Sequence, residues 1–236
     1  MESKTNVVLV HGAWADGSCW SKVSPPLQEK GFNVSAVQLP LTSLTDDIAV
    51  TRRMLAAQRG PTVLVGHSYG GAVITGAAND EPNVTALVYI AAFGLDEGES
   101  LESLSQQGPA SAGAAQIRPD DQGFLWIDRD GFPQAFAADV DPAEARVMAA
   151  VQKPLGVKAF RERSGPPAWK HIKSWYLVSS NDQMIPPQAE EFFAKRMGAT
   201  TLSVPASHAS MVSHPKEVTD IITQAAESAR TLAAKA

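Results

Sequence analysis

Cysteine is nearly absent from this 236-residue sequence, in which Cys19 is the only one. A single cysteine cannot form an internal disulfide, and no cysteine and histidine residues have the spacing of zinc ligands. We therefore expect no metal site. Long apolar runs are also absent, because none approaches the roughly 20 residues that a helix needs to cross a bilayer. These absences argue against an integral membrane protein.

Clusters of basic residues are missing too. Short pairs such as Arg52-Arg53 are scattered along the chain, and the net charge is −5. Binding to a nucleic-acid backbone needs a basic surface, so we expect no nucleic-acid partner, and we expect no membrane partner either. A predicted strand begins directly after Thr5, which leaves no room for a signal peptide. We therefore expect a cytoplasmic protein.

What the sequence does contain is an ordinary globular composition arranged as alternating strands and helices. Hydrophobic residues make up 44% of the chain and charged residues 19%, and the length is enough to bury one full core. Gly31 is predicted to end the first helix, and Thr45 is the predicted N-cap of the second. The alternation is typical of a mostly parallel sheet flanked by helices. Strands are predicted at 6–10, 32–37, 62–65 and 84–91, and helices at about 20–30, at about 46–59 and directly after Ser68.

The alternation breaks between residues 95 and 173, where Gly, Pro, Ser and Gln accumulate. Aromatic residues are interspersed there, which argues against a disordered linker, and we interpret the segment as a cap inserted into a single domain. One helix is predicted inside it, with Asp141 as N-cap, Pro142 in the first turn and Glu144 three residues after the cap. The core resumes with strands at 174–179 and 200–204 and helices at 188–197 and 215–234. We thus predict a core of residues 1–94 and 174–236 and a cap of residues 95–173.

The stretch Gly66-His67-Ser68-Tyr69-Gly70 matches the G-x-S-x-G pattern of a nucleophile elbow. In such an elbow, a sharp turn between a buried strand and a helix raises a serine hydroxyl above the sheet. The preceding residues are β-branched or Leu, and the following ones are small or apolar, as a strand and a closely packed helix require. An ordinary loop with a capping serine is the alternative. We predict that Ser68 is a nucleophile.

A serine hydroxyl needs a neighbouring base, and that base is most often histidine. Reactive groups in open α/β sheets lie just beyond the carboxyl ends of strands, and His11, His67 and His208 satisfy this condition. His11 follows the first strand and His67 belongs to the elbow, so we interpret both as structural. His214 stands at the start of the last predicted helix as a cap, and His171 precedes a strand. We select His208 as the base.

The histidine in turn needs an acid that fixes its tautomer and stabilises its charged form. Asp182 follows a predicted strand and completes the chain order Ser68, Asp182, His208 that is typical of α/β-hydrolases. Asp96, which follows an earlier strand, is the alternative acid. The alternative role for Asp182 is that of an ordinary turn aspartate.

Acyl transfer also requires hydrogen-bond donors for the oxyanion that develops in the transition state. The backbone N–H after the nucleophile, which belongs to Tyr69, is one candidate. The second should lie in the loop after the first strand. Ala13 is the position we predict, since Gly12 before it permits close approach of the backbone to a substrate.

Three motifs together resemble the α/β-hydrolase superfamily: residues 8–14 (Val-Leu-Val-His-Gly-Ala-Trp), the elbow, and residues 207–211 (Ser-His-Ala-Ser-Met). More narrowly, they are similar to the small group that contains plant methyl-ester esterases, hydroxynitrile lyases and related bacterial esterases. The resemblance covers nearly the whole chain and is weakest in the cap. It implies the α/β-hydrolase fold, a Ser-His-Asp site without a cofactor, and a cap that lines an apolar acyl or aromatic pocket. The candidate pocket residues are Trp14, Trp126 and Phe136, although cap aromatics often only pack the cap together.

Two positions distinguish hydrolysis from lyase chemistry within this group. The lyases carry threonine at the position of Gly12 and lysine at that of Ala209, and both differences favour hydrolysis. The sequence therefore predicts a carboxylesterase that acts through an acyl-enzyme on a small, apolar or aromatic ester, with lactones and thioesters as further options. A cofactor-free lyase, perhydrolase or dioxygenase is the alternative activity, and a ligand receptor retaining the triad is the alternative class. The oligomeric state stays open, with a homodimer among the options.

Overall fold

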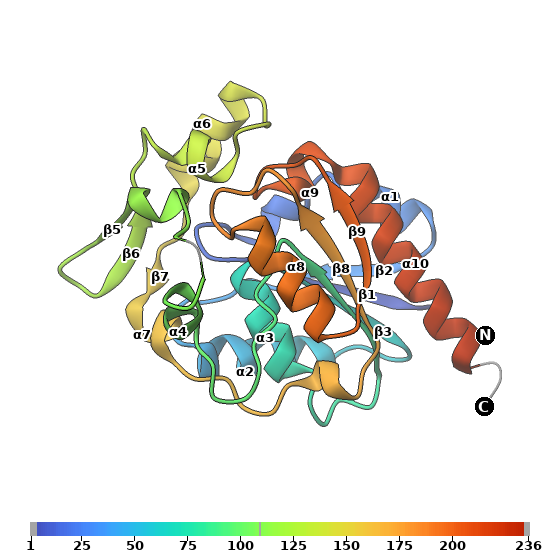
Figure 1. The fold of residues 1–236 in the computed structure, drawn as a ribbon. Helices are drawn as coiled ribbons and strands as arrows, with labels where there is room; N and C mark the ends of the chain where they lie inside the picture. Colours follow the sequence, from blue (N-terminus) through green and yellow to red (C-terminus); the bar gives the residue numbers. More distant parts are fainter. Residues whose placement is uncertain (1–3, 109, 234–236) are drawn as a thin grey trace.

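A six-stranded sheet forms the centre of the molecule, as seen in the computed structural model, which describes residues 4–108 and 110–233 (Figure 1). The strand order is β2-β1-β3-β4-β8-β9, and each neighbouring pair is parallel. This confirms the predicted α/β fold, with a described central sheet that is parallel throughout. The strands are β1 (Asn6–Val10), β2 (Asn33–Ala36), β3 (Thr62–His67), β4 (Val84–Ile90), β8 (Ser174–Ser179) and β9 (Thr200–Val204).

Helices cover both faces of this sheet, which is why β1, β3 and β8 are buried along their whole length. On one face, α1 (Ser24–Glu29) packs against the long last helix α10 (Pro215–Ala233) (Figure 1). On the other face lie α2 (Leu44–Ala56), α3 (Tyr69–Ala77) and α8 (Pro187–Arg196). None of the helices in the described part of the chain combines the length and the apolarity needed to span a bilayer.

The segment between β4 and β8 contains a second, three-stranded antiparallel sheet, which lies apart from the central sheet at the left of Figure 1. We call residues 95–173 the cap, and its boundaries stay our interpretation. Its helix α6 begins as predicted, because Asp141 accepts hydrogen bonds from the backbone N–H groups of Ala143 and Glu144. The cap elements are α4 (Leu101–Ser105), β5 (Ile117–Pro119), β6 (Phe124–Ile127), α5 (Phe132–Phe136), α6 (Pro142–Val151), β7 (Leu155–Gly156) and α7 (Val157–Arg161).

Two predicted helix starts were wrong. Helix α2 begins at Leu44 with Ser43 as its N-cap, whose hydroxyl accepts a 3.1 Å hydrogen bond from the Asp46 N–H. Thr45 is already inside the helix, and its hydroxyl hydrogen-bonds to Glu162 of the cap. The helix predicted at 20–30 starts later, at Ser24, after a short 3-10 helix at Gly17–Trp20. At α2, Thr42, Ser43 and Thr45 are all possible caps, and the contact of Thr45 with the cap segment leaves Ser43 as the N-cap. Helix α1 begins after Val23, which makes no side-chain capping hydrogen bond, and has proline in its first turn.

The strand order determines where a site can form. β1 pairs with β2 on one side and with β3 on the other, so the direction of winding reverses between β1 and β3. A crevice forms at the carboxyl ends of two such strands. In the register of the sheet Val10 lies beside Gly66, so the loop after β1 and the elbow after β3 are neighbours.

Candidate active site

The elbow places Ser68 in a strained backbone conformation between β3 and α3. Its φ of 53° and ψ of −123° are rare for a residue with a side chain. The turn can pack against β1 because Gly70 has no side chain: a Cβ there would lie 2.6 Å from the Val10 carbonyl oxygen. Although Ser68 stands at the N-cap of α3, its hydroxyl makes no capping hydrogen bond. The alternative of an ordinary capping serine is therefore wrong.

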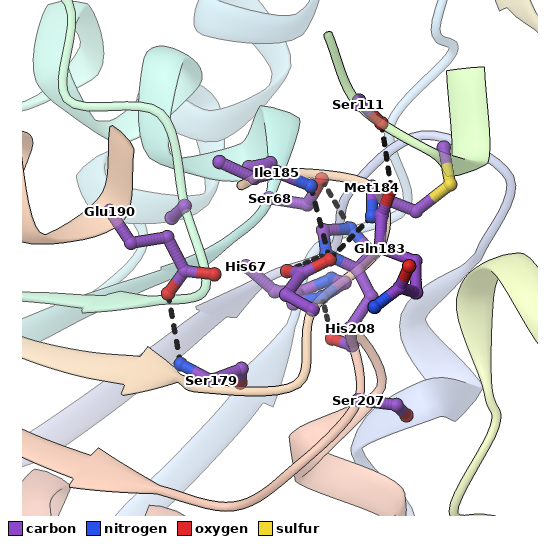
Figure 2. Close-up of polar contacts among 12 residues, drawn as sticks. His67, Ser68, Ser111, Ser179, Gln183, Met184, Ile185, Glu190, Ser207 and His208 are labelled. Carbon is purple, nitrogen blue, oxygen red and sulfur yellow. Dashed lines mark hydrogen bonds and ion pairs between the residues drawn. The ribbon is translucent and has the colours of Figure 1, made fainter. Parts of the chain in front are cut away.

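Three side chains distant in sequence form a continuous hydrogen-bonded chain at this point, of which Figure 2 labels Ser68 and His208. Ser68 Oγ lies 2.8 Å from His208 Nε2, and His208 Nδ1 lies 2.5 Å from Asp182 Oδ2. A carboxylate accepts only, so Nδ1 carries the proton and Nε2 is free to accept from the serine hydroxyl. Ser68 is 4% exposed, Asp182 3% and His208 fully buried, so bulk water scarcely weakens these interactions. The structure thus brings together all three residues predicted for catalysis.

Asp182 is held in place by the turn that follows β8. Its Oδ1 accepts hydrogen bonds from the backbone N–H groups of Met184 (2.6 Å) and Ile185 (3.0 Å), which leaves Oδ2 to face the histidine. The alternative acid, Asp96, instead forms a partly exposed ion pair with Lys170 at 2.6 Å. The structure therefore brings Asp182, and not Asp96, to His208.

The loop that carries His208 is fastened by the cap. Asp139 accepts hydrogen bonds from both the backbone N–H and the hydroxyl of Ser207, and the Ala209 N–H donates to the Phe136 carbonyl at 3.1 Å. The Phe136 ring also meets the His208 imidazole edge to face, with 4.8 Å between the ring centroids. Cap contacts therefore hold the backbone on both sides of His208 and one edge of its ring.

His67 and His11 hold the surrounding loops as neutral side chains. His67 donates from Nε2 to the His208 carbonyl at 2.9 Å, and burial lowers the pKa of His67 well below its usual range. His11 donates from Nδ1 to the Gly12 carbonyl and accepts from the Leu39 N–H at Nε2, while burial lowers its pKa to about 4. Their predicted structural role agrees with these contacts. His214 lies outside the site, and its Nδ1 is 2.9 Å from the hydroxyl oxygen of its neighbour Ser213.

Two backbone amides near Ser68 match the predicted oxyanion donors. Neither the Ala13 N–H nor the Tyr69 N–H has a hydrogen-bond partner within the described chain. The next amide, that of Trp14, is already bound to the Lys153 carbonyl at 3.0 Å. The loop after β1 runs directly against the nucleophile, because a Cβ on Gly12 would lie 2.7 Å from the Ser68 Cβ. The arrangement leaves two donors free at the carboxyl ends of β1 and β3.

The three aromatic residues predicted to line the pocket have other contacts. The Trp14 indole N–H donates to the Leu125 carbonyl at 2.8 Å, and the Trp126 indole N–H donates to Asp120 in the adjacent turn at 2.8 Å. Phe136 is fully buried against the histidine. A role for these residues in contacting substrate stays a prediction.

The sequence analysis did not identify three acids near the site: Asp139, which is partly exposed, and the buried Glu190 and Asp47. Glu190 and Asp47 are fully buried, the first under the turn that carries Asp182 and the second against the Tyr69 hydroxyl. Both lie in helices beside a second acidic residue, Glu191 and Asp46. A buried and an exposed acid look alike in such a pair, so no local signal could have identified them.

The chain belongs to the alpha/beta hydrolase family, whose model matches residues 7–221. It is 28% identical to a pyrethroid hydrolase of Sphingobium wenxiniae over 94% of this chain and 88% of that protein. It is 24% identical to the polyneuridine aldehyde esterase of Rauvolfia serpentina, over 92% of this chain and 94% of the other. A crystal structure of a pyrethroid hydrolase superposes with a TM-score of 0.81 at 25% identity, covering 94% of this chain and 97% of that one.

Proposed function

We propose that this protein is a serine carboxylesterase in which Ser68 is the nucleophile, His208 the general base and Asp182 the residue that orients the base. The observation that carries the proposal is the buried chain of hydrogen bonds from Ser68 Oγ through the imidazole to Asp182. The imidazole has the tautomer that this chemistry requires. The names of relatives that span nearly the whole chain, a pyrethroid hydrolase and an esterase, further support cleavage of an ester.

The proposed reaction has two halves. The Ser68 oxygen attacks the ester carbonyl carbon while its proton passes to His208 Nε2, and the developing oxyanion accepts hydrogen bonds from the Ala13 and Tyr69 amides. His208 then returns the proton to the departing alcohol oxygen, which leaves an acyl group on Ser68. Water repeats the sequence, giving its proton to His208, and releases the acid. Asp182 stays ionised throughout and stabilises the imidazolium.

The surroundings of Ser68 favour hydrolysis over the lyase alternative. Gly12 has no room for a side chain next to the nucleophile, and Ala209 leaves no cation directly after His208. We propose a small, apolar or aromatic ester as the substrate, because Phe136 of the cap meets the His208 ring and Trp14 lies in the loop after β1 that runs against Ser68. The cytoplasmic location expected from the sequence stays a prediction.

Replacing Ser68 by Ala tests the proposal. We expect kcat for a short aromatic ester to fall by about four to six orders of magnitude with little change in melting temperature, since the only side-chain hydrogen bond of Ser68 among the described residues is the one to His208. Turnover should be followed with a panel of esters of varied acyl and alcohol size. A serine-reactive phosphonate should label Ser68 in the unmodified protein, as mapped by mass spectrometry of its peptides.

Ser203→Ala is the matched control, since Ser203 lies exposed on β9. This variant should keep both its activity and its labelling at Ser68. Near-normal turnover by Ser68→Ala would contradict the proposal. If each protein molecule cleaves one ester and then retains the product, a ligand receptor would be favoured instead. Cleavage of cyanohydrins without cleavage of esters would favour a lyase.

A further inference from the structure

Glu190 is a second buried carboxyl group beside the proposed triad. It lies on α8, is fully buried, and accepts a 3.0 Å hydrogen bond at Oε2 from the Ser179 N–H (Figure 2). Among the described residues none donates to its other oxygen, Oε1. An ionised carboxylate with a single protein donor is costly in a protein interior. The ionisation state of Glu190 therefore needs a physical explanation.

Ser179 connects Glu190 with Asp182. The N–H of Ser179 donates to Glu190, and its carbonyl accepts from the Asp182 N–H at 3.1 Å, so the two acids flank the end of β8. Of the ionisable groups, Asp182 acts most strongly on the Glu190 carboxyl group, through its charge and through a side-chain hydrogen bond. Two neighbouring buried carboxylates repel each other strongly when both are ionised, whereas one proton between them gives a hydrogen bond.

The donors around the two carboxyl groups decide which one holds the proton. Asp182 accepts from His208, Met184 and Ile185, and several donors stabilise the ionised form of a carboxylate. Within the described residues, Glu190 accepts from Ser179 alone. A carboxylate has about four acceptor positions, so Asp182 retains about one for a further donor. The proton therefore belongs on Glu190.

We propose that Glu190 is a positioning residue: a neutral carboxylic acid whose O–H donates to the Asp182 carboxylate and keeps it aligned with His208. The effect of Glu190 on kcat rests on the proposed function, whereas its protonation state does not. Burial raises the pKa of Glu190 well above its usual range, and the charge of Asp182 raises it further. The other ionisable groups acting on this pair are Tyr176 and Glu191, both acids, while His208 lies on the far side of Asp182.

Infrared spectroscopy tests the protonation state directly. We expect the unmodified protein at neutral pH to show the C=O stretching band of a buried, protonated carboxylic acid. Glu190→Gln should abolish this band. Glu191→Gln, which alters the exposed neighbour, should retain it. A spectrum of the unmodified protein without such a band, or one that Glu190→Gln leaves intact, would overturn the proposal.

Kinetics test the positioning role. Glutamine keeps a neutral donor toward Asp182 and an acceptor toward Ser179, so Glu190→Gln should retain kcat/KM within about threefold and the same acid limb of its pH profile. Glu190→Leu removes the donor, and kcat should fall about tenfold or more with little change in KM. The neighbouring variant Glu191→Gln should match the unmodified protein.

The direction in which the acid limb of the pH profile moves in Glu190→Gln shows whether Glu190 is ionised or neutral. If Glu190 were ionised, Glu190→Gln would remove a negative charge near His208 and move the acid limb to lower pH, which would overturn the proposal. If Glu190→Leu fails to fold, the glutamine variant and the infrared band still decide the outcome. An unmodified protein without esterase activity would contradict the proposed function, whereas the infrared band would still test Glu190.

Discussion

At the residue scale, the candidate site depends on how closely the loop after β1 approaches the nucleophile. Gly12 marks the closest point, since a Cβ there would lie 2.7 Å from the Ser68 Cβ and 3.0 Å from the His67 carbonyl oxygen. The latter is a backbone atom and cannot move independently of the elbow. Any side chain at position 12 must therefore displace the elbow, the loop or both.

Gly12→Ala is expected to lower kcat by about tenfold or more, because displacing Ser68 by a fraction of an ångström misaligns the reacting groups. Overpacking should also cost about 1–3 kcal/mol of unfolding free energy. Gly165→Ala is the matched control, since a Cβ at this exposed position meets no atom of the described residues within 4 Å. Ester turnover and chemical denaturation should be measured for both variants. Equal turnover by the two would show that the loop after β1 does not constrain the position of Ser68.

Single residues differed in how far the sequence could predict them. Ser68 was identifiable because the chemistry and the strand-turn-helix geometry of the elbow both lie within a few neighbouring residues. Glu190 was not, because its burial results from α8 packing under the turn after β8 and leaves no mark on the local sequence. Asp139 likewise acquires its role only through contact with Ser207, 68 residues away.

At the scale of elements, a buried carboxylate joins helix α2 to the elbow helix α3. Asp47 accepts a 2.6 Å hydrogen bond from the Tyr69 hydroxyl and a 2.8 Å hydrogen bond from the Leu41 N–H. The Leu41 carbonyl in turn accepts from the Gly156 N–H of the cap strand β7 at 2.8 Å. Asp47 thus connects α2, the residue that supplies a proposed oxyanion donor, and the base of the cap.

This link should make stability depend on pH. Burial raises the pKa of Asp47 from 3.8 to about 6, although the hydrogen bonds from Tyr69 and Leu41 oppose the rise. The folded protein then binds the proton more tightly than the unfolded chain, so this contribution to stability is complete below pH 3.8 and is lost as pH rises to about 6. Relative to Asp47→Asn, the unmodified protein should lose on the order of 2 kcal/mol of unfolding free energy across this window.

The neighbouring residue provides a control of opposite sign. Asp46 is exposed, and hydrogen bonds from Ser43 and Thr42 lower its pKa, so its contribution to stability should appear above the ordinary aspartate pKa and fade as the pH falls. Urea denaturation of Asp47→Asn and Asp46→Asn at several pH values should give difference curves that slope in opposite directions. If the difference in unfolding free energy between Asp47→Asn and the unmodified protein did not change with pH, the raised pKa of Asp47 would be contradicted.

At the scale of the whole molecule, the cap does more than cover the site. Phe136 and Asp139 of the cap hold both sides of the His208 backbone, while Ser111 and Gly113 of the cap each donate at 2.7 Å to the carbonyl of Gln183, directly after Asp182. Two members of the proposed triad are therefore fastened to the cap. The core without its cap should not retain the geometry of the site.

Asp139→Ala is expected to lower kcat by about tenfold, because Ser207 loses both hydrogen bonds and the loop carrying His208 is then held on one side less firmly. The loss of these bonds should also cost about 1–3 kcal/mol of unfolding free energy. Asp121→Ala, at an exposed position of the same cap, should change neither quantity. Steady-state kinetics and thermal unfolding of the two variants provide the measurement. An unchanged kcat in Asp139→Ala would show that the hydrogen bonds from Ser207 to Asp139 do not position His208.

The sequence by itself determined the central fold and the identity of Ser68, His208 and Asp182 as candidates, because buried parallel strands are apolar runs and reactive residues follow their carboxyl ends. It did not determine the three-stranded sheet of the cap, whose short strands carry no clear alternation, or the N-cap of α2. Only the tertiary structure decided which acid meets His208, which carboxyl groups are buried, and how the cap holds the site. The physical reason is that burial and hydrogen bonding between distant segments depend on packing, which local sequence patterns do not record.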